Sequence, residues 1–259
     1  MMGLRKKKTA IVTGGLSGIG FAVAKALADN GIRVAIGARR GGNTALYADI
    51  QIALGEDTAI YPLNVRDEGS VDEFCKSIRE ETGSIDILVN AAGICLHQTV
   101  TGHSLSDWQD VLETNLTGPF LMSRACLPGM IDAGWGRIVN IASTAARTAV
   151  PDHPAYCASK AGLVGLTRAI ALEGAPHGVT CVSISPTWVE TDMLRQSTEI
   201  MAPLQGRSVA EEIAELAKAN PQNRLVQPNE IAALTAFLCS DAAPALTMED
   251  ISVNAGAHW

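Results

Sequence analysis

Two residues spaced one helical turn apart, Tyr156 and Lys160, could exchange protons with a substrate oxygen. They begin a predicted helix whose apolar positions continue through Leu163, Leu166 and Ile170, so both side chains lie on one face. A phenol with a pKa of about 10 is a weak acid or base near neutrality. We expect the Lys160 ammonium to lower that pKa toward the working pH, although simple packing of the two side chains on a helix surface would leave the same pattern.

Two further polar residues could take part in the same chemistry. Ser143 follows the apolar run 137–141, which reads as a strand. In a parallel sheet, ligands bind beyond the carboxyl ends of the strands, where a serine hydroxyl can donate a hydrogen bond to a substrate oxygen. Asn115 lies inside a predicted helix over 108–131. Its side chain could hold a water molecule or a backbone carbonyl near the lysine.

A glycine-rich turn follows the first apolar run of the chain and opens a predicted helix over about 18–30. Glycines allow a sharp turn and a close backbone approach to a pyrophosphate, and the helix N-terminus offers free N–H groups. A tight connection between a strand and a helix would explain the glycines without a ligand. As candidates for holding a dinucleotide we take Gly14, Ser17, Gly18, Ile19 and Gly20.

The end of the second predicted strand bears on the choice of dinucleotide. An acidic residue there usually binds the ribose diol of NAD, whereas arginine suits the additional phosphate of NADP. This strand ends in Arg39 and Arg40 with no carboxylate, and a guanidinium binds phosphate through two hydrogen bonds. We therefore expect NADP to be favoured over NAD, the alternative being that both arginines are ordinary surface charges.

Apolar runs alternate with helical stretches along the whole chain. The runs are apolar nearly throughout, as expected of strands covered on both faces. They predict an α/β fold: a single doubly wound parallel sheet of about seven strands with helices on both faces, forming one domain over 1–259. Capping boxes are predicted at Ser106–Gln109 and Ser208–Glu211. The segment at about 190–222 interrupts the alternation and reads as an extended connection that covers the substrate. The predicted strands cover 9–12, 33–37, 59–63, 86–89, 137–141, 179–184 and 251–253.

Composition excludes several classes of function. The net charge of −7 argues against a nucleic-acid partner. No apolar run approaches the roughly twenty residues that span a bilayer. The six cysteines form no CxxC pair and no cluster with histidine, so we predict no metal site, reduced thiols and a cytoplasmic protein.

Taken together in chain order, these motifs resemble the short-chain dehydrogenase/reductase family. The match runs over nearly the whole chain. Each motif is weak alone, and the occurrence of all of them in this order is what makes the match specific. It consists of TGxxxGxG at 13–20, NAAG at 90–93, Asn115, Ser143, Tyr156-x-x-x-Lys160 and Pro186-x-x-x-x-Thr191. The resemblance implies a single Rossmann-like domain and hydride transfer between a ketone and a secondary alcohol with NAD(P).

The resemblance also implies roles for individual residues. A proton relay would run from Tyr156 through the cofactor ribose and Lys160 to a water held by Asn115, while Ser143 polarises the carbonyl. Members of the family are usually tetramers built on the long helices after the fourth and fifth strands, so a homotetramer is expected. Further cofactor contacts would come from Asn64, Val65, Asn90, Ala91, Gly93, Pro186, Val189 and Thr191.

Some positions depart from the family pattern. Asn64 stands where an aspartate usually caps the adenine, Ala91 replaces the second asparagine of a pair, and Thr187 replaces a glycine. These changes leave the proton relay untouched and place the adenine contact and the nicotinamide-side backbone in question.

The substrate is the least determined feature of the sequence. Cys95, His153 and Trp188 are the candidate substrate contacts, and an apolar chamber is expected from Leu96, Trp188, Met193, Leu194, Met201 and Leu204. A small, mostly apolar ketone or alcohol is our hypothesis. The alternatives are a 3-oxoacyl thioester, a 3-hydroxy acid, or a nucleotide-sensing regulatory protein that performs no catalysis on the same fold.

Overall fold

Seven parallel strands form the central sheet of the protein. The computed structural model describes residues 7–39 and 44–257. The strands pair side by side in the order β3-β2-β1-β4-β5-β6-β7, and every pair is parallel. The predicted seven-stranded doubly wound sheet is therefore confirmed. The strands are β1 (Thr9–Thr13), β2 (Arg33–Ala38), β3 (Thr58–Pro62), β4 (Ile87–Asn90), β5 (Gly136–Ile141), β6 (Val179–Pro186) and β7 (Asp250–Val253).

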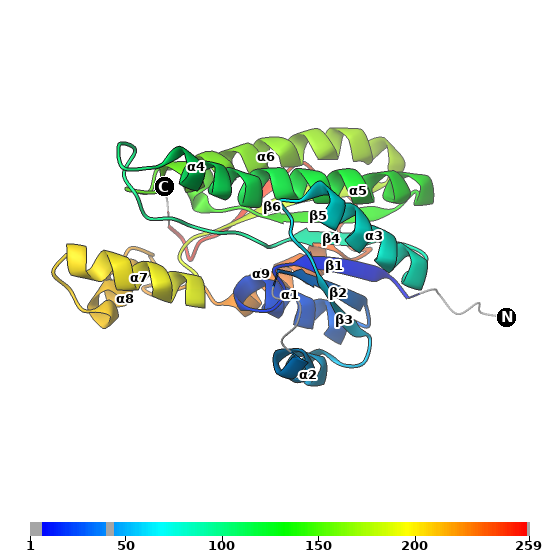
Figure 1. Ribbon diagram of the computed structural model, residues 1–259, viewed down its shortest axis with the longest axis horizontal. Coiled ribbons are helices and arrows are strands. Elements are labelled where there is room, and N and C mark those ends of the chain that lie inside the picture. The colour runs from blue at the N-terminus through cyan, green and yellow to red at the C-terminus, as the bar shows by residue number, and fades with distance from the viewer. Residues whose placement is uncertain (1–6, 40–43, 258–259) are drawn as a thin grey trace.

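Helices cover both faces of this sheet (Figure 1). One face carries α1 (Gly18–Asp29), α2 (Thr44–Leu54) and α9 (Pro228–Leu238), and the other carries α3 (Glu68–Thr82), α4 (Leu105–Leu112), α5 (Gly118–Ala133) and α6 (Pro154–Gly174). A pair of helices, α7 (Asp192–Leu204) and α8 (Val209–Lys218), projects beyond the two layers at one end. No helix in the described part of the chain has the length and apolarity to cross a membrane.

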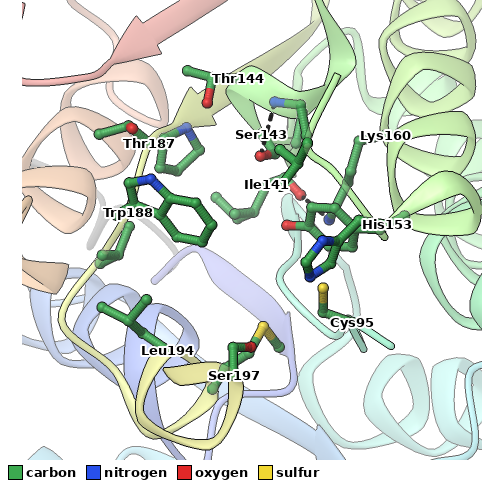
Figure 2. Close-up of a pocket in the computed structure, with 18 of the residues that line it drawn as sticks. Cys95, Ile141, Ser143, Thr144, His153, Lys160, Thr187, Trp188, Leu194 and Ser197 are labelled. Carbon is green, nitrogen blue, oxygen red and sulfur yellow. Dashed lines mark hydrogen bonds between the residues drawn. The ribbon is translucent and has the colours of Figure 1, made fainter. Parts of the chain in front are cut away.

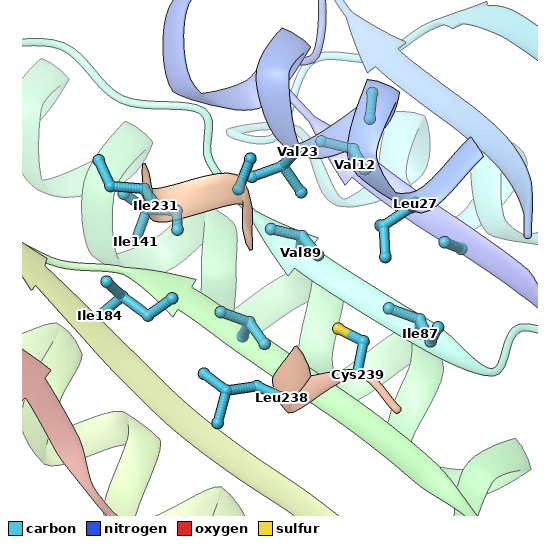
Figure 3. Close-up of a cluster of buried hydrophobic side chains, with 14 of the residues drawn as sticks. Val12, Val23, Leu27, Ile87, Val89, Ile141, Ile184, Ile231, Leu238 and Cys239 are labelled. Carbon is cyan, nitrogen blue, oxygen red and sulfur yellow. The ribbon is translucent and has the colours of Figure 1, made fainter. Parts of the chain in front are cut away.

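Alternate residues of each central strand enter two separate apolar cores. In β4, for example, Val89 belongs to the core under α1 and α9 while Leu88 belongs to the core under α3 and α5. Figure 3 shows the first of these cores, where Val23 and Leu27 of α1 and Ile231 of α9 pack over the strands. Because both faces are apolar, each strand reads as an almost continuous hydrophobic run in the sequence.

The starts of two helices test the capping predictions. The box at Ser208 is confirmed: the Ser208 hydroxyl accepts from the Glu211 N–H, and the Glu211 carboxylate accepts from the Ser208 N–H. The box at Ser106 is wrong, because α4 begins two residues earlier and Ser104 caps it by accepting from the Asp107 N–H at 3.0 Å. Leucine at 105 starts the helix, so the earlier serine is the one with extended backbone.

The segment 190–222, predicted as a long connection, contains the two helices α7 and α8. Leu194 of α7, Leu216 of α8 and the later Leu225 pack in one apolar cluster. Thr191 caps α7 by accepting from the Leu194 N–H. Pro203 and Gly206, which interrupt the helical pattern in the sequence, mark the end of the first helix and the turn into the second.

An ion pair secures the chain where it returns from α8 to the sheet. The Arg224 guanidinium donates to both Glu230 carboxylate oxygens, at 2.6 and 2.8 Å, and the same carboxylate accepts from the Gln227 N–H at 2.8 Å. Between them, Val226 pairs with Val189 in an isolated β-bridge. The Arg224 guanidinium, acting with the Gln227 N–H, lowers the pKa of Glu230 to about 2.

This pair predicts a loss of stability in acid. The ionised Glu230 is favoured in the folded state, so its contribution is complete above about pH 4.5, its ordinary pKa, and fades as the pH falls toward about 2. We expect Glu230→Gln to lower the melting temperature at pH 7 and to approach the wild type at pH 3. Glu199→Gln, at an exposed carboxylate of α7, is the matched control. A difference that stays constant between pH 7 and pH 3 would contradict the role of the ion pair.

Candidate active site

Two adjoining cavities lie beyond the carboxyl ends of the central strands. The first, called here the Tyr156 cavity, contains most of the residues expected to perform chemistry or bind substrate: Cys95, Ser143, His153, Tyr156, Lys160, Pro186, Trp188, Val189 and Thr191. The second, the Gly14 cavity, is lined by Gly14, Ser17, Gly18, Ile19, Gly20, Arg39, Asn64, Val65, Ala91, Gly93 and Thr191. The two share Ile19, Ala91, Gly93, Thr191 and Met193, so they are parts of one depression. Among the described catalytic and dinucleotide-binding candidates, Asn90 and Asn115 line neither cavity.

Tyr156 and Lys160 stand one turn apart at the start of α6, as their spacing predicts. The Lys160 ammonium lies 5.5 Å from the centre of the Tyr156 ring and is almost completely buried. It donates a hydrogen bond of 2.8 Å to the Ile141 carbonyl, at the end of β5. Burial disfavours the charged form and lowers the pKa of Lys160 to about 8. The amine can therefore hold or release a proton near neutral pH.

The pKa of Tyr156 does not follow the sequence expectation. Burial raises it above the usual value for a phenol, and the hydrogen bond with Ser143 opposes that change only in part. The Lys160 amine is directed to the Ile141 carbonyl. The pKa of Tyr156 is thus raised in this structure, where the sequence predicts a lowered value.

Ser143 reaches the same cavity from the end of β5. It has extended backbone and begins a short 3₁₀ turn, Thr144–Ala146. Its hydroxyl oxygen accepts from the Ala145 N–H at 3.1 Å, which fixes the side chain beside Tyr156, the residue with which it shares a hydrogen bond. Figure 2 shows Ser143 on one side of the cavity, with Trp188 opposite it. The site thus combines a hydroxyl donor and a phenol on one wall.

Asn115 lies behind this wall instead of on it. The predicted helix over 108–131 is interrupted by a π-helical turn, Glu113–Thr117, that contains it. Its side chain accepts from the Ile94 N–H and donates to the Ile94 carbonyl, both at 2.9 Å, and also donates to Ser159. Of the two partners considered from the sequence, a water or a backbone carbonyl, the structure contains the carbonyl. A β-carbon on Gly93 would lie 3.4 Å from Asn115 Oδ1 and 3.7 Å from Lys160 Nζ, so Asn115 lies close to the lysine.

Asn90 is likewise absent from the cavity walls. Its side chain points along the sheet and donates to Asn140 Oδ1 of β5 at 2.8 Å, and Asn140 in turn donates to Thr167 of α6. These three buried residues tie β4, β5 and α6 together. The side chain of Asn90 therefore supports the position of α6, while the neighbouring Ala91 and Gly93 face the cavities.

The glycine loop packs closely against the chain after β4 and against the start of α1. Gly14 has a φ of 69°, and a β-carbon there would meet Ala92 Cα at 2.8 Å. A β-carbon on Gly20 would lie 2.4 Å from the Gly14 carbonyl oxygen. The loop is packed this closely where α1 begins, so the free N–H groups of the helix N-terminus face the Gly14 cavity. This cradle has the chemistry that binds a pyrophosphate.

The far end of the Gly14 cavity is basic. Arg39 is exposed and lies at the end of β2, next to Asn64 and Val65, while Arg40 lies outside the described residues. Arg66 also lines the cavity, and the sequence analysis missed it. Its guanidinium donates to Asp110 and Glu113, in and just after α4. No motif near Arg66 in the sequence predicts these contacts. No group of histidine, cysteine or acidic residues in the described ranges has the arrangement of a metal site.

The apolar chamber contains half of the residues expected for it. Trp188, Met193 and Leu194 line the Tyr156 cavity. Met201 packs into the core between α7 and α8, Leu204 is 67% exposed, and Leu96 does not reach the cavity. The helical turn of α7 explains the division, because only the first turns of that helix face the sheet. Lining residues that the sequence analysis missed include Thr144, Thr148, Val150, Thr187 and Ser197.

Comparisons with known proteins agree with this geometry. The family model described as enoyl-(acyl carrier protein) reductase matches residues 14–258. D-threitol dehydrogenase of Mycolicibacterium smegmatis is 40% identical over 250 residues, covering 96% of this chain and 92% of that protein. The 3-oxoacyl-acyl-carrier-protein reductase FabG of Vibrio cholerae is 36% identical and covers 97% of both chains. A crystal structure of an actinorhodin polyketide ketoreductase variant with NADPH superposes with a TM-score of 0.93, at 35% identity and 99% coverage of both chains.

The fold and the paired cavities define a nicotinamide-dependent oxidoreductase that acts on CH–OH groups. The chain belongs to the short-chain dehydrogenase/reductase family. The Gly14 cradle, the helix N-terminus behind it and the adjoining Tyr156 cavity fit the dinucleotide that this family uses.

The cradle predicts a distinct effect for one glycine. Gly14→Ala and Gly31→Ala each place a side chain at a positive φ, which costs on the order of 1–3 kcal/mol of stability, but Gly31 has nothing within 4 Å. We expect both variants to unfold at lower urea concentration, and only Gly14→Ala to weaken dinucleotide binding, by tenfold or more. Titration followed by nicotinamide fluorescence measures the affinity. Equal affinities in Gly14→Ala and the wild type would rule out the loop as the binding cradle.

Proposed function

We propose that the protein interconverts a small ketone and a secondary alcohol, with NADP favoured as the dinucleotide. The residues that exchange a proton with the substrate oxygen, or support that exchange, are Tyr156, Lys160, Ser143 and Asn115. The observation that carries the proposal is the meeting of Tyr156, Lys160 and Ser143 in a cavity that opens into the glycine cradle. When bound, the nicotinamide supplies or accepts the hydride. The protein must then orient the substrate oxygen and exchange one proton with it.

Tyr156 and Ser143 are suited to the substrate oxygen. The raised pKa of Tyr156 keeps its hydroxyl protonated, so in the reductive direction it can give its proton to an oxygen that becomes an alkoxide. The Ser143 hydroxyl donates a hydrogen bond to the same oxygen and stabilises the developing charge. For oxidation of the alcohol the phenol must first lose its proton, which requires a positive charge beside it in the loaded enzyme.

Lys160 is the source of that charge. Its pKa of about 8 permits both states near neutrality, and its amine is held only 5.5 Å from the phenol ring. Asn115 does not face the cavity and fixes the backbone at Ile94 through two hydrogen bonds. Gly93, the residue before Ile94, lies between the Asn115 side chain and Lys160. The π-helical turn around Asn115 shifts backbone hydrogen bonds from the α-helical pattern, and such turns are frequent at functional sites.

The preference for NADP rests on Arg39. Arg39 is exposed in the Gly14 cavity and forms no ion pair with any residue in the described ranges, so it is available to a phosphate. No carboxylate follows β2 at the position that would bind the ribose diol of NAD.

The substrate cavity favours a small, uncharged molecule. Within the described ranges no arginine, aspartate or glutamate lines it, and its apolar lining includes Trp188, Met193 and Leu194. A 3-hydroxy acid would bring a carboxylate into it without an arginine partner, and an acyl-carrier thioester would bring an acidic protein to an acidic chain. Both remain second candidates, the thioester because the FabG relative carries that name.

We also propose a cytoplasmic homotetramer without nucleic-acid or membrane partners. All six cysteines are free thiols, which suits a reducing compartment. The outer surfaces of α5 and α6 expose apolar side chains, including Phe120 at 44% and Leu172 at 64%, as expected of helices that pack against other subunits.

Replacing the phenol tests the proposed chemistry. Tyr156→Phe is expected to lower kcat by about 10²–10⁴-fold on any ketone that the wild type reduces, because the proton donor is lost. NADPH affinity should change little. The control Tyr61→Phe, at a phenol of β3 that donates to Glu81 of α3 and lines neither cavity, should retain full activity. Wild-type turnover in Tyr156→Phe would refute the assignment.

Replacing the basic residue tests the choice of dinucleotide. Arg39→Ala is expected to raise the KM for NADPH at least tenfold while leaving the KM for NADH nearly unchanged, since only the former carries the extra phosphate. Arg33→Ala is the control, because it removes a cation at the other end of the same strand. Equal changes in the KM for NADPH and for NADH would show that Arg39 does not bind the additional phosphate.

A further inference from the structure

His153 occupies a special position in the substrate cavity. It is the residue immediately before α6, three positions ahead of Tyr156, and it lines the Tyr156 cavity although only 3% of it is exposed. Figure 2 shows its ring beside Cys95, on the wall from which Lys160 also approaches. The reaction described above makes no use of this side chain, so its polar atoms need another explanation.

The hydrogen bonds of His153 determine which ring nitrogen carries the proton. Nδ1 lies 2.6 Å from the Pro151 carbonyl oxygen. A carbonyl oxygen can only accept, so Nδ1 must carry the hydrogen and donate it. In the neutral ring Nε2 is then a lone-pair acceptor. The hydrogen bond that this side chain forms within the described part of the chain uses Nδ1, and the ring lines the cavity.

The surroundings of His153 keep the ring neutral. Burial lowers the pKa of His153, and the neighbouring His97, whose ring lies edge-on at 4.9 Å, acts in the same direction. The Pro151 carbonyl and the Asp152 carboxylate oppose this change without reversing it. Asp152 is turned toward His97 instead, with its carboxylate 3.6 Å from His97 Nε2. His153 therefore offers the cavity a hydrogen-bond acceptor and no positive charge.

His153 and Tyr156 reach the same cavity from the start of α6. His153 is the N-cap residue, with non-helical backbone, Tyr156 lies in the first turn of the helix, and both line the cavity. Tyr156 and Ser143 take the reacting oxygen. A small molecule bound there can present a second hydrogen-bond donor to His153 at the same time.

We propose that His153 is a specificity-determining residue whose Nε2 accepts a hydrogen bond from a second hydroxyl group, and that the substrates are hydroxyketones and the corresponding diols. This inference rests on the proposed function and names its substrate class. In the reductive direction the carbonyl carbon gains a hydride from the reduced nicotinamide and its oxygen gains the proton of Tyr156. The hydroxyl on His153 takes no part in the redox change and serves only to orient the molecule.

A matched pair of substrates tests the proposal. Acetoin and 2-butanone have the same carbon chain and carbonyl position and differ by one hydroxyl. We expect the wild type to favour acetoin by at least tenfold in kcat/KM, because a site built to bind a hydroxyl leaves its acceptor unpaired with the analogue that lacks one. His153→Phe should bring the ratio close to one, mainly by raising the KM for acetoin, and His153→Gln, which keeps an acceptor, should restore part of it.

The control is His177→Phe, which replaces an exposed histidine beyond the other end of α6 and should keep the wild-type ratio. A wild-type ratio near one, or a ratio that His153→Phe leaves unchanged, would overturn the proposal. If His153→Phe does not fold by circular dichroism, His153→Leu decides by the same ratio.

The proposed function can fail separately from this inference. If neither ketone is reduced by the wild type, binding of 2,3-butanediol to the enzyme loaded with NADP is measured through tryptophan fluorescence, since Trp188 lines the cavity. Binding that is at least tenfold weaker in His153→Phe supports the role of His153 without any turnover. Equal binding, or no binding by the wild type, overturns it.

Discussion

The hydrogen bond from the Lys160 amine to the Ile141 carbonyl is the contact on which the site depends. It joins α6 to the carboxyl end of β5, and a buried amine without such a partner would be strongly destabilising. Tyr156, one turn earlier, and Ser143, two residues after Ile141, are brought to one cavity by this junction. Asn90, Asn140 and Thr167 reinforce it from within the sheet, where each polar side chain has a partner in the next element.

Much of this arrangement could be predicted from the sequence because it follows from periodicity. Strands covered on both faces are apolar at most positions, so their number and order of appearance are visible in the chain. The i, i+4 spacing of Tyr156 and Lys160 places them on one helix face without knowledge of the tertiary structure. Glycines in a turn between a strand and a helix indicate the cradle in the same way.

Features that depend on distant partners could not be predicted. The direction of the Lys160 amine is set by a carbonyl on another element, and so the pKa of Tyr156 was expected to fall and is raised instead. Asn90 binds Asn140 fifty positions later, which its own motif does not reveal. The fold of 190–222 into two helices depends on contacts of Leu194 with Leu216 and Leu225, and a pattern broken by Pro203 and Gly206 obscures it.

The wall between the two cavities has a consequence for how ligands affect one another. Both cavities are lined by the same five residues, Ile19, Ala91, Gly93, Thr191 and Met193. Two of these, Ala91 and Gly93, have little or no side chain to separate the two spaces. A molecule in either space is therefore a direct neighbour of a molecule in the other. Whatever free energy one gains from that contact the other gains equally, so their affinities rise or fall together and by the same factor.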